Sequence, residues 1–239
     1  MNFKEPIGAF PYKPPSEEIK RNYKYIFEME SSLDFRFFKR FFDIFLSLTI
    51  LIFCIPIILV IKISYVLEGL IIKDNSGPIL FFYYAVSQGK VFKKYKIRVI
   101  KPQFIDQDKA NRGEWEAYTA EWSESTRTIT GYFVKKFYLD EIPQFYSVLI
   151  GEMSIVGPRP LAIIHYERDC EQGNVTRKIL KGGLLGLGHI NKGTPEMGNP
   201  IYEYIYIDKY IKSSSFGLFL LDIKIIFRGL SLIIRGGGH

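Results

Sequence analysis

Cysteine is scarce in this sequence, and several familiar motifs are absent from it. Two cysteines among 239 residues cannot build a disulfide scaffold and form no spaced metal-binding cluster, so we expect a reducing compartment. No apolar stretch precedes about residue 41, which argues against a secretory signal peptide. The sequence has no P-loop, Rossmann fingerprint, nucleophile elbow or zinc motif, and no internal repeat.

The residues that are present make an apolar and basic chain. It is 47% hydrophobic, 24% charged and 16% aromatic, which suits one substantial domain and excludes a disordered or collagen-like chain. The formal net charge of +7 fits nucleic acid, anionic lipid head groups or phosphorylated substrates as partners. Composition alone does not choose between them.

An uncharged run over residues 44–61 predicts membrane insertion. At about 1.5 Å per residue, a straight helix of this length reaches about 27 Å, which is marginal for crossing a bilayer. Pro56 lies inside the run and would kink the helix. Cations flank both ends of the run, namely Arg36, Lys39, Arg40, Lys62 and Lys73. We therefore expect a re-entrant helix in residues 34–73 with Arg36 and Lys73 on the same, cytoplasmic side; the alternative is one tilted span.

A second apolar stretch covers residues 216–228. Asp222, Lys224 and Arg228 interrupt it too often for a membrane span. The pattern is typical of an interfacial amphipathic helix over about 216–235, and an ordinary core helix fits it equally well.

Two polar segments lie between these apolar stretches. Hydrophobic residues at 95, 97 and 99 alternate with Lys94, Lys96 and Arg98, which indicates a strand with three cations on one face. That face is either solvated or a wall that binds phosphate. Residues 103–125 show no clear period and indicate a loop with a solvated acidic surface, formed by Asp106, Asp108, Glu114, Glu116, Glu121 and Glu124.

Residues 139–151 predict a short helix with two carboxylates at its start. Asp140 is a good N-cap, Pro143 suits the first turn, and Gly151 is a natural stop. Asp140 and Glu141 would stand where the helix dipole favours carboxylates and where free backbone N–H groups can hold a phosphate. Plain capping explains the same pair.

A stiff loop follows, in which Pro158 and Pro160 flank Arg159. A guanidinium held in this way suits bidentate recognition of phosphate. The glycine-rich residues 181–188 allow close backbone approach to a ligand or lipid. His189 is interpreted as a packed or surface histidine rather than a base.

Two of these segments resemble a known family. Residues 139–144 read Leu-Asp-Glu-Ile-Pro-Gln, and residues 151–160 read Gly-Glu-Met-Ser-Ile-Val-Gly-Pro-Arg-Pro. At this spacing they resemble the bacterial sugar transferases, which are monotopic polyprenyl-phosphate sugar-1-phosphate transferases (phosphoglycosyl transferases) that initiate surface polysaccharide or glycan assembly. The resemblance extends from about residue 36 to the end, with 39–43, 96–98 and 181–191 as supporting segments.

The sequence departs from the family pattern at positions that bear on sugar specificity and efficiency. Lys135 stands where an arginine is usual, and the spacing from Tyr210 to Asp222 is a few residues longer. The other departures are Ile55, Phe82, Tyr84, Val86, Gly182, Leu185 and His189.

The resemblance implies a two-step exchange that uses Mg²⁺. Asp140 would attack the sugar-bearing phosphorus of a nucleoside diphosphate sugar, for which a UDP-sugar is expected. A polyprenyl phosphate would then take the phosphosugar from Asp140. Glu141 would share the catalysis and the metal with Asp140. The residues expected to bind substrate phosphates are Lys96, Arg98, Lys135 and Arg159, and Asp222 is a further candidate.

These observations predict an α+β fold that is mostly helical: a membrane-associated domain with one re-entrant N-terminal hydrophobic helix, a small sheet and interfacial amphipathic helices. Residues 1–33 would form a polar N-terminal extension, 34–73 the re-entrant helix, and 74–239 a cytosolic catalytic domain. We expect it at the cytoplasmic face of the bacterial inner membrane, beside membrane lipids and downstream glycosyltransferases and without a nucleic acid partner. Two alternatives stay open: a catalytically weak membrane scaffold of a polysaccharide assembly complex, and a peripheral protein that binds anionic lipids.

Overall fold

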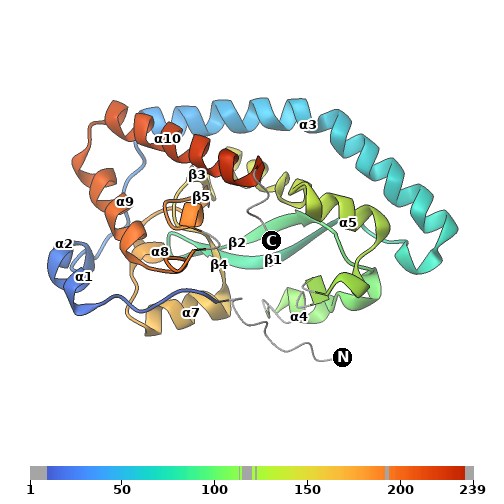
Figure 1. Ribbon diagram of the computed structural model, residues 1–239, viewed down its shortest axis with the longest axis horizontal. Helices are drawn as coiled ribbons and strands as arrows, with labels where there is room; N and C mark the ends of the chain where they lie inside the picture. The colour runs from blue at the N-terminus through green and yellow to red at the C-terminus, as the bar shows by residue number, and fades with distance from the viewer. Residues whose placement is uncertain (1–9, 113, 115–119, 122, 192–193, 235–239) are drawn as a thin grey trace.

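The computed structural model describes residues 10–112, 114, 120–121, 123–191 and 194–234 (Figure 1). Residues 1–9 of the predicted extension, Glu116 of the predicted acidic loop and residue 235 of the predicted interfacial helix lie outside this part. The helices are α1 (Glu17–Asn22), α2 (Lys24–Phe27), α3 (Phe37–Ile71), α4 (Gln107–Asn111), α5 (Ile129–Lys136), α6 (Gln144–Ile150), α7 (Ile163–Glu171), α8 (Thr176–Ile179), α9 (Ile201–Lys212) and α10 (Ser215–Ile234). The strands are β1 (Leu80–Ser87), β2 (Lys90–Ile97), β3 (Ser154–Val156), β4 (Leu161–Ala162) and β5 (Gly183–Leu185). The predicted class, mostly helical with a small sheet, is confirmed.

Helix α3 is the longest element and leaves most of its apolar surface outside the protein. It has 35 residues, and only 11% of its apolar segment is buried. Within the described ranges, it alone is long and apolar enough to cross a membrane. Figure 1 shows α3 running beside α10 and bending in its second half, as expected for a helix with Pro56 inside it. These features suggest membrane association.

Polar side chains fix both ends of α3 to the same folded body. Near its start, Lys39 Nζ donates hydrogen bonds to Asp222 Oδ2 at 2.7 Å and to the Val156 carbonyl at 2.8 Å. Asp43 accepts hydrogen bonds from Ser154 Oγ at 2.7 Å and Ile155 N at 3.1 Å. Near its end, Glu68 accepts hydrogen bonds from the first two backbone N–H groups of α5, both at 2.8 Å. Glu68, a residue of α3, therefore caps the N-terminus of α5.

A β-hairpin carries the predicted cationic strand. Strands β1 and β2 pair antiparallel, and their turn has positive φ at Gln88 and Gly89, as a type I′ turn requires. Strand β4 adds to β1, and β3 pairs in parallel with β5 in a second small sheet. The alternating pattern predicted over 94–99 lies mainly in β2, which begins earlier and ends at Ile97.

The main core lies beneath α9 and α10. Tyr204 and Ile207 of α9 and Leu218 and Ile225 of α10 are buried in it. Helices α1 and α2 also contribute, through Ile19 and Ile26, so the described part of the predicted N-terminal extension packs on the same body. Helix α10 has features of both a core helix and an amphipathic surface helix. One face is buried, and the other exposes Phe216, Leu220, Phe227 and Leu230.

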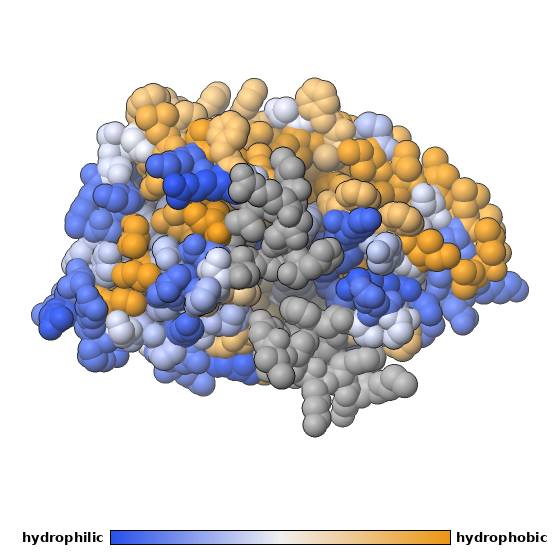
Figure 2. Space-filling model, viewed as in Figure 1, coloured by the Kyte–Doolittle hydropathy of each residue, from blue (hydrophilic) through white to orange (hydrophobic). Residues whose placement is uncertain are grey.

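Hydrophobic surface gathers on one side of the molecule. Figure 2 shows it along the edge formed by α3 and α10, with hydrophilic residues on the opposite edge around α1 and α2. Helix α5 adds to the exposed apolar surface with Ile129, Tyr132 and Phe133. A continuous apolar patch of this kind marks a surface for membrane or partner contact.

Candidate active site

The structure places Asp140 in a tight turn before a helix rather than at a helix N-cap. Residues Leu139–Glu141 form a 3₁₀ turn, and α6 begins only at Gln144, with Pro143 in the cap position and no side-chain cap. Tyr138, just before the turn, has a φ of 56°, an unfavourable value for a bulky residue. The N-cap prediction for Asp140 is therefore wrong, because the chain enters the helix through this turn. The turn aims the Asp140 side chain into the protein, where it is 1% exposed.

Two lysines and a second carboxylate surround Asp140. Its Oδ2 lies 2.9 Å from Lys96 Nζ of β2 and 3.7 Å from Lys135 Nζ of α5. Glu121 Oε1 accepts hydrogen bonds from Lys96 Nζ at 3.1 Å and from Lys135 Nζ. Neither oxygen of Asp140 accepts a hydrogen bond, although Oδ2 is within ion-pair distance of Lys96. A buried carboxylate with two cations beside it is equipped to act on an electrophile that carries negative charge.

The charges in this cluster stabilise one another. Burial acts to lower the pKa of Lys96, but Glu121, Asp140 and Glu141 raise it well above its usual value. Burial acts to raise the pKa of Glu121, but Lys96 and Lys135 lower it to about 2. Lys96 and Glu121 are therefore both charged at neutral pH.

Glu141 and Arg159 form a second pair next to Asp140. Arg159 Nη2 donates a hydrogen bond to Glu141 Oε1 at 2.8 Å. Burial acts to raise the pKa of Glu141, but Arg159, Lys96 and Lys94 lower it well below its usual value. Glu141 in turn raises the pKa of Arg159. Burial, and then the charge of Arg159, lowers the pKa of the nearby Lys94 well below its usual value.

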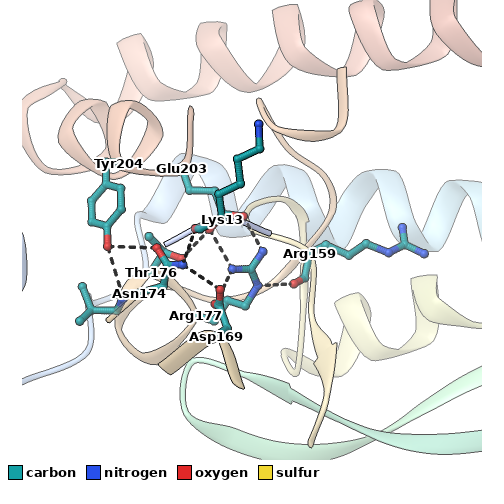
Figure 3. Close-up of polar contacts among 9 residues, drawn as sticks. Lys13, Arg159, Asp169, Asn174, Thr176, Arg177, Glu203 and Tyr204 are labelled. Atoms are coloured by element: carbon teal, nitrogen blue, oxygen red, sulfur yellow. Dashed lines mark hydrogen bonds and ion pairs between the residues drawn. The ribbon is translucent and has the colours of Figure 1, made fainter. Parts of the chain in front are cut away.

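A buried arginine fixes the loop that carries Arg159. Arg177 Nε donates a hydrogen bond to the Arg159 carbonyl at 2.9 Å, and its other nitrogens bind Asp169 Oδ2 at 2.7 Å and Glu203 Oε1 at 2.5 Å. Figure 3 shows this network, with the Arg159 side chain extending away from it. The Tyr12 ring lies over the Arg177 guanidinium, with 4.3 Å between its centroid and Cζ. Residues from α7, α8 and α9 thus set the position of one candidate phosphate-binding residue.

The structure brings together most, though not all, of the predicted site residues. Asp140, Glu141, Lys96, Lys135 and Arg159 form one connected cluster. Two predicted residues, Arg98 and Asp222, have other partners.

Arg98 and Asp222 bind groups of the protein that lie outside the Asp140 cluster. All three side-chain nitrogens of Arg98 donate to backbone carbonyls, those of Pro78, Ile100 and Asn75, at 2.8 to 2.9 Å. Arg98 is fully buried, so its prediction as a phosphate-binding residue is corrected to one that holds the chain around the 3₁₀ turn Lys73–Asn75 and β2. Asp222 is bound by Lys39 and by the Tyr206 hydroxyl at 2.7 Å, where it joins α10 to α3.

Sequence reasoning missed Glu121 and passed over Lys94. The sequence pattern predicts a solvated acidic surface for Glu121, and this is wrong because its carboxylate lies between Lys96 and Lys135, with 16% of its side chain exposed. The pattern places Lys94 on the cationic strand face but does not mark it as a site residue. The alternation of β2 was the signal for Lys94, since it points Lys94 and Lys96 to the same face. No local pattern marks Glu121.

The cluster suits a metal ion that is shared with a substrate. No group of three or more His, Cys, Asp or Glu side chains that could hold a metal occurs among the described residues. Mg²⁺ commonly uses only one or two carboxylates and takes its other ligands from substrate phosphates and water. Asp140 and Glu141 offer two adjacent carboxylates, and the oxygens of Asp140 accept no hydrogen bond. This donor set fits Mg²⁺ in the presence of a diphosphate.

Comparison with known proteins returns relatives that share most of this chain. The undecaprenyl-phosphate galactose phosphotransferase of Salmonella typhimurium is 31% identical over 216 residues, which are 85% of this chain and 42% of that protein. The UDP-glucose:undecaprenyl-phosphate glucose-1-phosphate transferases of Klebsiella pneumoniae and Escherichia coli are 36% and 32% identical, over 80% of this chain in each case and over 38% and 39% of those proteins. The chain thus spans less than half the length of these relatives. The model of the family described as bacterial sugar transferase matches residues 34–236, so this chain belongs to that family.

Proposed function

We propose that this protein transfers a sugar 1-phosphate from a nucleoside diphosphate sugar to a polyprenyl phosphate and so initiates the assembly of a glycan. The observation that carries the proposal is Asp140, a buried carboxylate with two lysines beside it and the Glu141–Arg159 pair next to it. The names of the relatives, which include UDP-glucose and undecaprenyl phosphate, support this substrate class.

In the first step, an Asp140 oxygen attacks the sugar-bearing phosphorus of the donor. A bond forms between that oxygen and phosphorus, the phosphoanhydride bond breaks, and the nucleoside monophosphate leaves with the bridging oxygen. Lys96 and Lys135 lie where they can offset the charge that develops on the phosphoryl oxygens. Arg159 is placed to bind a second phosphate of the donor.

In the second step, a phosphate oxygen of the polyprenyl phosphate attacks the same phosphorus. The bond from phosphorus to Asp140 breaks, which restores the carboxylate and yields a polyprenyl diphosphate sugar. Glu141 stands one residue from Asp140, and Arg159 keeps its carboxylate ionised. Asp140 and Glu141 would hold Mg²⁺, which when bound would offset the charge of the diphosphate.

We also propose that α3 enters and leaves the membrane on the cytoplasmic side. Both ends of α3 bind the same folded body, through Lys39 and Asp43 at one end and Glu68 at the other. Cysteines placed at Arg36 and Lys73, in a protein whose Cys54 and Cys170 are replaced by serine, should react alike with an impermeant maleimide. We expect labelling only in permeabilised cells. Opposite accessibility would establish a span instead.

The catalytic proposal is tested by intact-protein mass spectrometry with a panel of UDP-sugars, Mg²⁺ and no lipid acceptor. We expect a phosphosugar adduct on the wild-type protein and none on Asp140→Asn, which keeps the shape but removes the charged nucleophile. Glu141→Gln should lose most turnover and still form some adduct. Glu124→Gln, the same change at an exposed side chain, is the control.

Two results would contradict the catalytic proposal. A stable adduct on the Asp140→Asn protein would move the nucleophile elsewhere. No adduct and no UMP release with any donor, even after addition of undecaprenyl phosphate, would favour the membrane scaffold.

A further inference from the structure

An apolar groove runs between the second half of α3 and α5. Its volume is about 700 Å³, within the range of ordinary ligand pockets. Its wall is formed mainly by apolar side chains, among them Pro56, Val60, Ile129, Phe133 and Leu139. Pro56 is one of these residues, so the groove begins where α3 bends.

The polar groups of the groove wall are already bound within the protein. The carboxylate of Glu68 accepts hydrogen bonds from Ile129 N, Thr130 N and Asn75 Nδ2. The Ser64 hydroxyl donates to the Val60 carbonyl at 2.9 Å. What remains for a ligand is mainly hydrocarbon, which favours an apolar chain over a polar molecule.

One end of the groove adjoins the candidate active site. Leu139 lines the groove, and the next residue in the same turn is Asp140. Lys135 belongs to α5, the helix that also supplies Ile129, Phe133 and Val134 to the groove, and its Nζ lies 3.7 Å from Asp140. The apolar groove thus has a residue of the Asp140 turn in its wall and shares α5 with Lys135.

We infer that this groove binds the isoprenoid chain of the acceptor, a polyprenyl phosphate, and directs its phosphate to Asp140. This inference rests on the proposed function and adds the place of the lipid. The groove suits this lipid in two ways: its apolar wall fits the isoprenoid chain, and Lys96 and Lys135, beside Asp140, fit the anionic head group. The groove also lies on the apolar side of the molecule, between two helices that expose Val60, Ile129 and Phe133, so a lipid can enter it from the membrane.

Photo-crosslinking tests the groove without any need for turnover. The full-length protein in vesicles of phosphatidylethanolamine and phosphatidylglycerol would be labelled with a polyprenyl phosphate that carries a diazirine in its chain. We expect labels on groove residues of α3 and α5, which unlabelled undecaprenyl phosphate removes and added phosphatidylglycerol does not. Labels elsewhere, or equal competition by phosphatidylglycerol, would overturn the inference; the second result would mean a groove for bulk lipid.

A groove-filling variant gives a second test. Val60→Trp places a large ring in the groove at a side chain that is 62% exposed, so the fold is retained. Ile52→Trp, at a side chain of α3 that is 54% exposed and does not line the groove, is the matched control. The KM for undecaprenyl phosphate should rise about tenfold or more in Val60→Trp, which corresponds to about 1.4 kcal/mol. The KM for geranyl phosphate, whose chain is short, should change little.

Different results would overturn the groove proposal and the proposed chemistry of Asp140. Adduct formation without lipid should be the same in Val60→Trp and the wild type, because the groove takes no part in the donor step. An equal rise in KM in Ile52→Trp, or an unchanged KM in Val60→Trp, would overturn the groove while the adduct persists. Loss of the adduct from the wild-type protein would overturn the proposed chemistry, and the crosslinking result would still decide the groove.

Discussion

Replacing Arg177 should destabilise the fold and displace a residue of the candidate active site. Arg177 has a 2% exposed side chain and binds two acids, Asp169 and Glu203, whose side chains are 1% and 11% exposed. Arg177→Met keeps much of the volume but leaves both carboxylates buried without a cation. Removal of one partner from a buried ion pair typically lowers the free energy of unfolding by about 3–5 kcal/mol. For a chain of this size, that is a fall in melting temperature of about 6–20 °C.

Arg177→Lys distinguishes the effect of the positive charge from the effect of the guanidinium's hydrogen-bond geometry. Arg177→Lys keeps the positive charge but cannot reproduce the contacts that the guanidinium makes with Asp169, Glu203 and the Arg159 carbonyl. We expect its melting temperature to lie between those of Arg177→Met and the wild type. Because the Arg159 carbonyl loses its donor in both variants, the KM for the sugar nucleotide should rise more than kcat falls.

Thermal unfolding in detergent and donor kinetics measure both effects. Arg112→Met, at an exposed arginine paired with Glu114, is the control and should melt close to the wild type. The double variant Arg177→Met with Asp169→Asn should be less destabilised than the sum of the single variants, since the two side chains are in contact. A melting temperature of Arg177→Met within about 2 °C of the wild type would refute the reasoning.

Lys39→Met should lower the melting temperature in the same way, because it leaves Asp222 buried without its cation, and a thermal scan beside Lys39→Arg measures this. Pro56→Leu should straighten α3 and move it towards spanning, which would appear as opposite labelling of cysteines placed at Arg36 and Lys73. Acid should weaken the Glu121 ion pairs. Its pKa is lowered from 4.5 to about 2 in the folded state, so its contribution to stability is complete above about pH 4.5 and is lost as the pH falls towards 2. Chemical unfolding over this range should show a steeper loss for the wild type than for Glu121→Gln.

Contiguous motifs were the part of the site that could be predicted from sequence. Asp140, Glu141 and Arg159 lie within one segment of twenty residues, and their neighbours restrict the backbone, so residue type and spacing are informative. Lys96 could be found from the alternation of β2, which puts every second side chain on one face. The pattern did not distinguish Lys96 from Arg98, because the end of the strand at Ile97 decides that Arg98 turns towards backbone carbonyls.

Other features depend on tertiary contacts that no local pattern encodes. Glu121 is far from Lys96 in sequence, and its segment shows no periodicity that would indicate burial. The start of α6 was misplaced because Asp140 followed by Pro143 satisfies the sequence rules for a helix start, whereas Tyr138 adopts a left-handed conformation and opens a 3₁₀ turn. The sequence of α10 fits an interfacial helix and a core helix equally well for a similar reason, since the partner of its Asp222 is Lys39, 183 positions away.

Two of the cations that precede the apolar run of α3, Lys39 and Arg40, bind groups within the folded protein. They supported a membrane orientation through the positive-inside rule, which concerns cations in solvated loops. Lys39 is instead buried against Asp222, and Arg40 donates hydrogen bonds to the Val148 and Leu149 carbonyls at 2.7 and 2.8 Å, at the end of α6. Breaking these contacts would leave buried charges and carbonyls unpaired, so they hold the start of α3 to the body that carries Asp140. Since Glu68 holds the other end of α3 to α5, the same contacts that support the re-entrant proposal also keep the groove beside Asp140.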